Sequence, residues 1–77
     1  MDMRALVGTN VRHWRQKRGM TQEAFSVKSG LTQQYISDLE RGRRNPTVVT
    51  LFELATALSV RPQDLLRPRR LKIKGRA

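Results

Sequence analysis

The sequence predicts an all-α protein, a compact bundle of five helices in one domain. Three observations indicate this fold. Apolar residues recur at helical spacing, threonines suited to capping precede three of the periodic segments, and glycine or proline separates the segments. A chain of 77 residues has room for one domain with a small core. We expect residues 1–66 to form this domain and residues 67–77 to be a flexible basic tail.

The first helix is expected from about Met3 to Arg18. Gly19 follows a cation in its last turn, which is typical of a helix C-terminus. One stripe of this helix, within about 80° on a helical wheel, is apolar and is expected to face the core: Met3, Val7, Val11 and Trp14.

Two short helices joined by a tight turn are predicted within residues 21–41. Thr21 is suited to cap a helix from about Gln22 to Ser29. Gly30 then supplies the left-handed backbone that ends a helix, and Thr32 caps the next one. This order is the layout of a helix-turn-helix motif, whose second helix lies in the DNA major groove.

The second helix of this motif has an apolar face and an opposite polar face. The apolar face holds Tyr35, Ile36 and Leu39, and the polar face holds Gln33, Gln34, Ser37, Asp38 and Arg41. A glutamine amide offers a donor and an acceptor side by side, which matches N6 and N7 of adenine in the major groove. Amphipathicity alone does not distinguish a base-reading face from an ordinary exposed face, so both interpretations stay open at this point.

The motif and its flanks resemble the Xre-type helix-turn-helix family, which includes the lambdoid phage repressors and Cro-like domains. The similarity extends from about Val7 to Leu66 without a gap. It is carried by many residues at fixed spacing: Arg15, Gly19-Met20-Thr21-Gln22, Phe25, Gly30, Ile36, Glu40-Arg41-Gly42-Arg43-Arg44-Asn45-Pro46, Leu51, Leu54-Ala55, Leu58 and Leu65-Leu66. The resemblance implies a lambda-repressor-like fold and sequence-specific binding to double-stranded DNA by a transcriptional regulator that acts as a repressor.

The resemblance also implies roles for individual side chains. Four would face the bases, with the two glutamines making bidentate contacts: Gln33, Gln34, Ser37 and Asp38. Seven would contact the DNA backbone: Thr21, Gln22, Thr32, Arg41, Arg43, Arg44 and Asn45. Gln22 would in addition buttress the first glutamine, Gln33. Arg15 and Glu40 would form a structural ion pair between the first and third helices.

Asp38 departs from the family pattern. A carboxylate only accepts hydrogen bonds and meets the negative field of the groove, so its natural base partner is N4 of cytosine. The alternative is an ion pair outside the groove with Arg41 or Arg43.

A fourth helix is expected from about Val48 to Leu58 after the cap Thr47, and a short fifth helix from Pro62 to about Leu66. The core face of the fourth helix would hold Val48, Leu51, Leu54, Ala55 and Leu58. A single module of this kind has a small DNA interface, so we expect a homodimer. The resemblance implies an interface near the last helix, with the candidates Phe52, Val60, Leu65 and Leu66.

The net charge of +10 is unevenly distributed. Residues 67–77 hold six cations and no acid, which leaves +4 for residues 1–66. Such a distribution favours polyanions, with nucleic acid first and an anionic membrane surface second.

Several other classes of protein are disfavoured. There is no cysteine, one histidine and no glycine-rich phosphate loop, so we expect no metal, no cofactor and no enzymatic activity. No apolar run approaches the roughly 18 residues of a membrane helix, and we expect a cytoplasmic protein of bacterial or phage origin.

Two alternative functions remain. One is a protein-binding module on the same fold, such as an antitoxin or anti-activator that controls a protein partner, and the other is a non-specific polyanion binder that acts through the tail.

Overall fold

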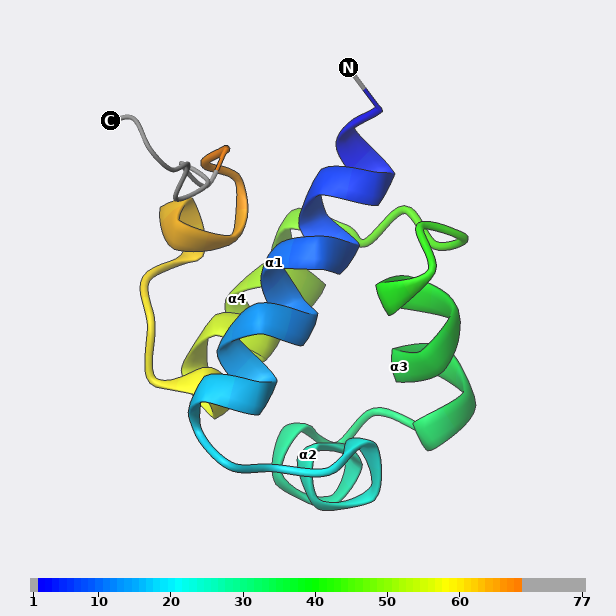
Figure 1. Cartoon of the computed structure of the whole chain (residues 1–77), viewed down its shortest axis with the longest axis vertical. Helices are drawn as coiled ribbons and strands as arrows, with labels where there is room; N and C mark the ends of the chain where they lie inside the picture. The colour runs from blue at the N-terminus through cyan, green and yellow to red at the C-terminus, as the bar shows by residue number, and fades with distance from the viewer. Residues whose placement is uncertain (1, 69–77) are drawn as a thin grey trace, which may run out of the picture.

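Four α-helices and one 3₁₀ helix form the protein in the computed structural model, which describes residues 2–68 (Figure 1). The elements in chain order are α1 (Met3–Lys17), α2 (Gln22–Ser29), α3 (Gln33–Glu40), α4 (Val48–Leu58) and η1 (Pro62–Leu65). The described part of the chain contains no strand, so the all-α prediction is confirmed. The proposed basic tail lies, from residue 69 onward, outside the described residues.

The prediction of five α-helices is wrong in its last member. η1 is a 3₁₀ helix, in which the N–H groups of Asp64 and Leu66 donate to carbonyls three residues back, those of Arg61 and Gln63. The Asp64 carboxylate also accepts a hydrogen bond from the Arg61 N–H at 2.9 Å. Four residues closed by these tight bonds leave no room for an α-helical ladder.

Local capping explains where the helices begin. The side-chain oxygens of Thr21, Thr32 and Thr47 accept hydrogen bonds from the backbone N–H three residues later, at 3.0, 3.0 and 3.1 Å. Each bond satisfies a donor that the first helical turn leaves unpaired. Gly30 ends α2 with φ of 81°, the left-handed conformation that glycine adopts without steric cost. The three predicted caps and the turn glycine are therefore confirmed.

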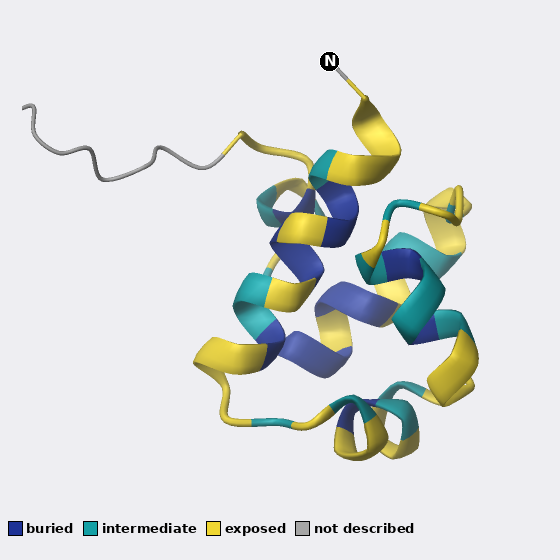
Figure 2. Cartoon of the chain, turned by 45° about the vertical axis from the view of Figure 1, so that its right-hand side comes forward, coloured by how far each residue is buried: buried dark blue, intermediate teal, exposed yellow. Residues whose placement is uncertain are grey.

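The core lies where the inner faces of the helices meet, as the inward-facing buried segments in Figure 2 show. Its apolar residues are Val7, Val11, Phe25, Ile36, Leu39, Leu54, Ala55, Ala57, Leu58 and Leu65. Two residues expected in it are exposed instead, Met3 at 49% and Val48 at 82%. Each is the first residue of its helix, at the rim of the bundle, where neighbouring helices do not cover it.

Two contacts fix how the elements sit around α1. Gly8 lies so close to α3 that a methyl group in its place would collide with the carbonyl oxygen of Leu39. Farther along α1, the buried amide of Asn10 donates to the carbonyl oxygens of Leu65 and Arg67, each at 2.9 Å. These hydrogen bonds attach η1 and the residues after it to α1, on the side of the bundle away from α3 (Figure 1). Among the described residues, no helix is both long and apolar enough to span a membrane.

Candidate nucleic-acid interface

The turn between α2 and α3 is held by the hydroxyl groups of two serines. Ser26 donates to the carbonyl oxygen of Leu31, and the Ser29 hydroxyl accepts from the Leu31 N–H at 3.2 Å. Leu31 itself packs against the core. With the left-handed Gly30, these contacts fix the angle at which α3 leaves α2. The arrangement is a helix-turn-helix with α3 in the position of the reading helix.

The outer face of α3 presents the polar side chains that the sequence assigned to it. Gln33 and Gln34 are exposed in the first turn, and Ser37 and Asp38 are half-buried one turn later. Gln33 has no side-chain hydrogen bond to any residue from 2 to 68. Gln34, in contrast, donates from Nε2 to Oδ1 of Asp38 at 3.0 Å.

Asp38 forms its ion pair with Arg44, and not with Arg41 or Arg43, which the sequence offered as the alternative to a cytosine contact. Oδ2 of Asp38 lies 3.6 Å from Nη2 of Arg44. Gly42, with φ of 77°, turns the chain after α3, and Arg44 returns across the helix. The Arg44 guanidinium also lies 5.0 Å from the centre of the Tyr35 ring, at cation–π distance.

Burial raises the pKa of the Tyr35 phenol above its ordinary value, and the positive charge of Arg44 offsets part of this shift. The phenol therefore stays neutral at physiological pH. Arg44 consequently meets an uncharged ring on one side and the carboxylate of Asp38 on the other.

Glu40 connects α1, α2 and α3 behind the reading face. Its carboxylate accepts from Nε and Nη2 of Arg15 at 2.6 and 3.1 Å, which forms the ion pair that the sequence suggested between α1 and α3. A third hydrogen bond, at 3.1 Å, comes from Nε2 of Gln22 at the start of α2. Gln22 therefore buttresses Glu40 and not Gln33, because an ionised carboxylate is the stronger acceptor within its reach.

A polar recess of about 230 Å³ opens between α1, α2 and the end of α3. It is lined by Arg12, Arg15, Gln22, Ser37, Glu40 and Arg41. Arg15 and Glu40 neutralise each other, but Arg12 and Arg41 are exposed and, within the described chain, form no ion pair. Two unpaired guanidinium groups thus flank a recess that also offers amide and hydroxyl donors, which suits an anionic oxygen.

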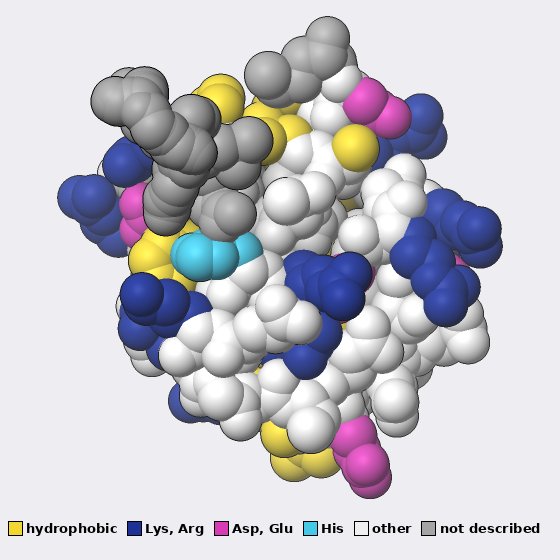
Figure 3. Space-filling view, in the orientation of Figure 1, with side chains coloured by type: hydrophobic (Ala, Val, Ile, Leu, Met, Phe, Trp, Pro, Cys, Tyr) yellow, Lys and Arg dark blue, Asp and Glu magenta, His cyan; other side chains and the backbone are white. Residues whose placement is uncertain are grey.

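Arg12 is a candidate that sequence reasoning missed. On the helical wheel it is one more cation off the core stripe, and nothing in the sequence connects it with Gln22 or Arg41. Figure 3 shows Lys and Arg side chains gathered over α1 and, separately, over the loop that follows α3. In that loop Arg43, Arg44 and Asn45 are all exposed. The cations are therefore distributed on both sides of the exposed face of α3.

Thr21 and Thr32 are exposed, as a contact to the DNA backbone would require, but both already act as helix caps. In each case the hydroxyl oxygen accepts a helical N–H, which leaves the hydroxyl hydrogen available as a donor.

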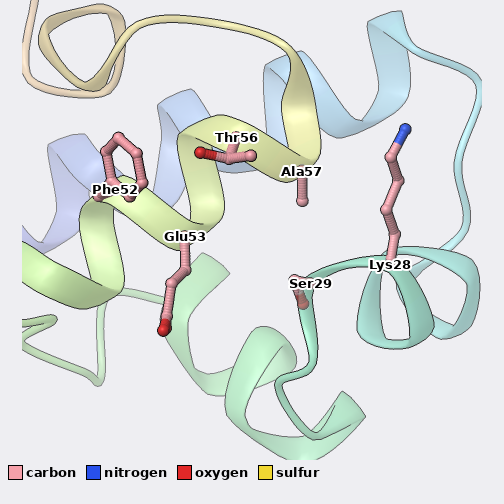
Figure 4. A pocket seen from close by; sticks show the side chains of 6 residues that line it. All are labelled: Lys28, Ser29, Phe52, Glu53, Thr56 and Ala57. Atoms are coloured by element: carbon pink, nitrogen blue, oxygen red, sulfur yellow. The ribbon is translucent and has the colours of Figure 1, made fainter.

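The candidate residues for self-association do not lie on one surface. Leu65 is fully buried and belongs to the core, because η1 packs it between α1 and α4, so its assignment to an interface is wrong. Val60 is half-buried against the same core. Phe52 and Leu66 are exposed at 60% and 40%. Phe52 lines an open groove of about 270 Å³ between α4 and the end of α2 (Figure 4).

The fold and the polar face of α3 together define the class of the protein, a helix-turn-helix domain. Residues 11–65 match the family model described as Helix-turn-helix, HTH_3. The chain belongs to this family and is an Xre-type helix-turn-helix transcriptional regulator of the DNA-binding type.

Two relatives illustrate the similarity in sequence. The chain is 57% identical over 68 residues to the uncharacterized HTH-type transcriptional regulator y4dJ of Sinorhizobium fredii, with 88% of each chain covered. It is 41% identical over 66 residues to the control protein C.BamHI of Bacillus amyloliquefaciens, which covers 84% of this chain and 82% of that protein.

Two solved structures share the fold. The hypothetical transcription factor NHTF from Neisseria has a TM-score of 0.83 at 36% identity, over 87% of this chain and 77% of that chain. The biofilm master regulator SinR, crystallised in complex with DNA, has a TM-score of 0.76 at 26% identity, over 79% of this chain and 98% of that chain.

Proposed function

We propose that the protein is a sequence-specific repressor that binds double-stranded DNA as a homodimer, with α3 in the major groove. The observation that carries this proposal is the pair of exposed glutamines in the first turn of α3, with cations on both sides of the helix. Occupation of a promoter by such a domain would exclude other proteins from the same DNA, which is the simplest form of repression. The site of action would be the cytoplasm.

The bases would be read by the amides of Gln33 and Gln34 with Ser37 and Asp38 beside them. A bidentate glutamine contact favours adenine by about 1–3 kcal/mol. The complex of SinR with DNA supports double-stranded DNA as the partner of this fold.

The phosphates would be held by two groups of residues. The recess between α1, α2 and α3 would take one phosphate between Arg12, Arg41 and Gln22. The loop after α3 would take another on Arg43, Arg44 and Asn45, and the hydroxyl groups of Thr21 and Thr32 would donate to the backbone between them. Contacts of this kind fix the register of the protein on DNA but carry no sequence information.

Two copies are proposed because one module reads few base pairs. A single domain buries roughly 600–1,000 Å² on DNA, and half-sites one helical turn apart match a twofold dimer. The exposed apolar face of α4, which includes Phe52, supports self-association.

The proposal is tested by selecting bound sequences from random duplexes at physiological salt, followed by the double variant Gln33→Ala with Gln34→Ala. We expect the selected site to lose at least about thirtyfold in affinity, the lower bound for two bidentate contacts. Affinity for an unrelated duplex should stay the same, because the phosphate contacts remain. Fluorescence anisotropy at one fixed salt concentration measures both.

The matched control is Gln63→Ala, which removes an exposed glutamine from η1, on the side of the bundle away from α3. Retention of full site preference by the double variant would contradict the proposal. It would favour a protein-binding role for the same fold.

A further inference from the structure

The two adjacent glutamines of α3 differ in how they are held. Gln33 is free of side-chain hydrogen bonds to the described residues, whereas Nε2 of Gln34 donates to Asp38 one turn later, at 3.0 Å. The spacing of four residues places the two side chains of this pair on the same face of the helix. One amide can therefore turn freely, and the other has a partner before any DNA arrives.

The chemistry of Asp38 permits one orientation of the Gln34 amide. The two ends of an amide are ordinarily distinguished only by their hydrogen-bond partners. An ionised carboxylate accepts and never donates, so the NH₂ group of Gln34 must face it and the carbonyl oxygen must point elsewhere. The order of donor and acceptor along the outer edge of Gln34 is thereby set.

Asp38 is in turn fixed from the other side. Its second oxygen lies 3.6 Å from the Arg44 guanidinium, which stacks over the ring of Tyr35. Tyr35 packs against the core. A continuous series of contacts therefore connects the core to the outer edge of Gln34. The positive charge of Arg44 also offsets the negative charge of Asp38, which would otherwise be repelled by the DNA.

We propose that Asp38 is a positioning residue that makes Gln34 read the direction of an A·T base pair. This inference rests on the proposed function. Held by Asp38, Gln34 presents Oε1 and its second N–H in one fixed order, which matches N6–H and N7 of adenine in one orientation of the pair. An unheld amide can turn about its last side-chain bond and present the reverse order.

The same geometry makes Asp38 itself a poor partner for a base. One of its oxygens faces Gln34 and the other faces Arg44, so neither points freely toward N4 of a cytosine. Asp38 acts on sequence preference through Gln34. The direct contact to cytosine that the sequence suggested is not needed.

The experiment compares wild type, Asp38→Ala, Gln34→Ala and the double variant on the selected duplex and on all its single-base-pair variants. We expect Asp38→Ala to reduce the preference for A·T over T·A about tenfold at one base pair in each half-site. That base pair should be the one at which Gln34→Ala also loses preference. In the Gln34→Ala background, Asp38→Ala should have no further effect there, because the two changes remove the same contact.

Asp38→Asn provides the rescue. Its amide oxygen can still accept from Gln34, so most of the preference should return although the charge is gone. Gln33→Ala is the matched control. It should reduce the preference at the base pair that Gln33 contacts by the same factor in wild type and in Asp38→Ala. Thermal unfolding followed by circular dichroism checks that every variant is folded.

A loss of preference by Asp38→Ala at a different base pair from Gln34→Ala would overturn the inference, since Asp38 would then touch a base itself. Additive effects of the two changes would overturn it as well.

The side-chain amide resonances of the free protein give a test without DNA. The signal of Gln34 should move in Asp38→Ala while that of Gln33 stays, and an unmoved Gln34 signal contradicts the inference even where sequence-specific binding is intact. Absence of any selected sequence for wild type would instead overturn the proposed function.

Discussion

Glu40 illustrates how one side chain serves both stability and the site. It is nearly buried and receives hydrogen bonds from Arg15 on α1 and Gln22 on α2. A charge in such a position is tolerated because it is paired and hydrogen-bonded, and loss of either partner would leave a buried charge without compensation. The same bonds hold Arg15 and Gln22 at the recess beside α3, so the buried ion pair also shapes a surface for phosphate.

Among the described residues, Arg12 is the unpaired cation on the α1 side of the recess. Arg12→Gln should weaken binding to all duplexes alike, because a phosphate contact carries no sequence information. The slope of log K against log salt should become less steep by about 1. Titrations at four or more salt concentrations measure this slope.

The control for that prediction is Arg61→Gln, an exposed arginine that precedes η1 on the side of the bundle away from α3. Its salt slope should equal that of wild type. An unchanged slope for Arg12→Gln, or a change in preference at one base pair, would show that Arg12 does not hold a phosphate.

At the scale of elements, the contact between α1 and α3 decides the position of the reading helix. Gly8 allows the backbone of α1 to approach the carbonyl oxygen of Leu39. By helix propensity alone, glycine at this position destabilises the helix by roughly 1 kcal/mol relative to alanine. The close approach outweighs that local cost, because any side chain would force the two helices apart.

Gly8→Ala should therefore lower the free energy of unfolding by about 2 kcal/mol or more, as expected for overpacking against a backbone that cannot give way. Thr9→Ala, at the exposed neighbouring position on the same helix, is the control and should be neutral or slightly stabilising. Urea unfolding measures both, with a shifted midpoint at constant slope. If Gly8→Ala proves as stable as Thr9→Ala, the close packing of α1 on α3 is not a constraint.

At the scale of the whole molecule, α4 exposes several large apolar side chains among the described residues. Val48, Val49 and Phe52, which lie in the first five residues of α4, are 82, 66 and 60% exposed. The groove beside Phe52 is also lined by Lys28, Ser29, Glu53, Thr56 and Ala57 (Figure 4). Apolar side chains gathered in this way are typical of a protein contact.

Phe52→Glu should therefore shift the protein toward monomer, because two carboxylates would face each other across a twofold contact. Sedimentation velocity over a range of concentrations, with and without operator-length DNA, measures this. Val27→Glu is the control, since Val27 is 82% exposed but lies on α2 and does not line the groove. A wild-type protein that is monomeric both free and on DNA would count against the dimer.

The four α-helices, the turn between α2 and α3 and the polar face of α3 could all be predicted from the sequence alone. Helix capping joins each threonine to an N–H group three residues later, at Thr21, Thr32 and Thr47. The turn depends on the left-handed backbone of Gly30 itself, so both features follow from local spacing alone. The ion pair between Arg15 and Glu40 was also predicted, through the resemblance to a known family.

Which distant side chains meet became visible only once the helices were packed together. It placed Arg12 beside Arg41, paired Asp38 with Arg44, gave Gln22 to Glu40 and buried Leu65 in the core. Each of these outcomes depends on the angles between helices and on how the chain turns after Gly42. Such angles follow from the packing of all the elements together, which no local spacing in a sequence specifies.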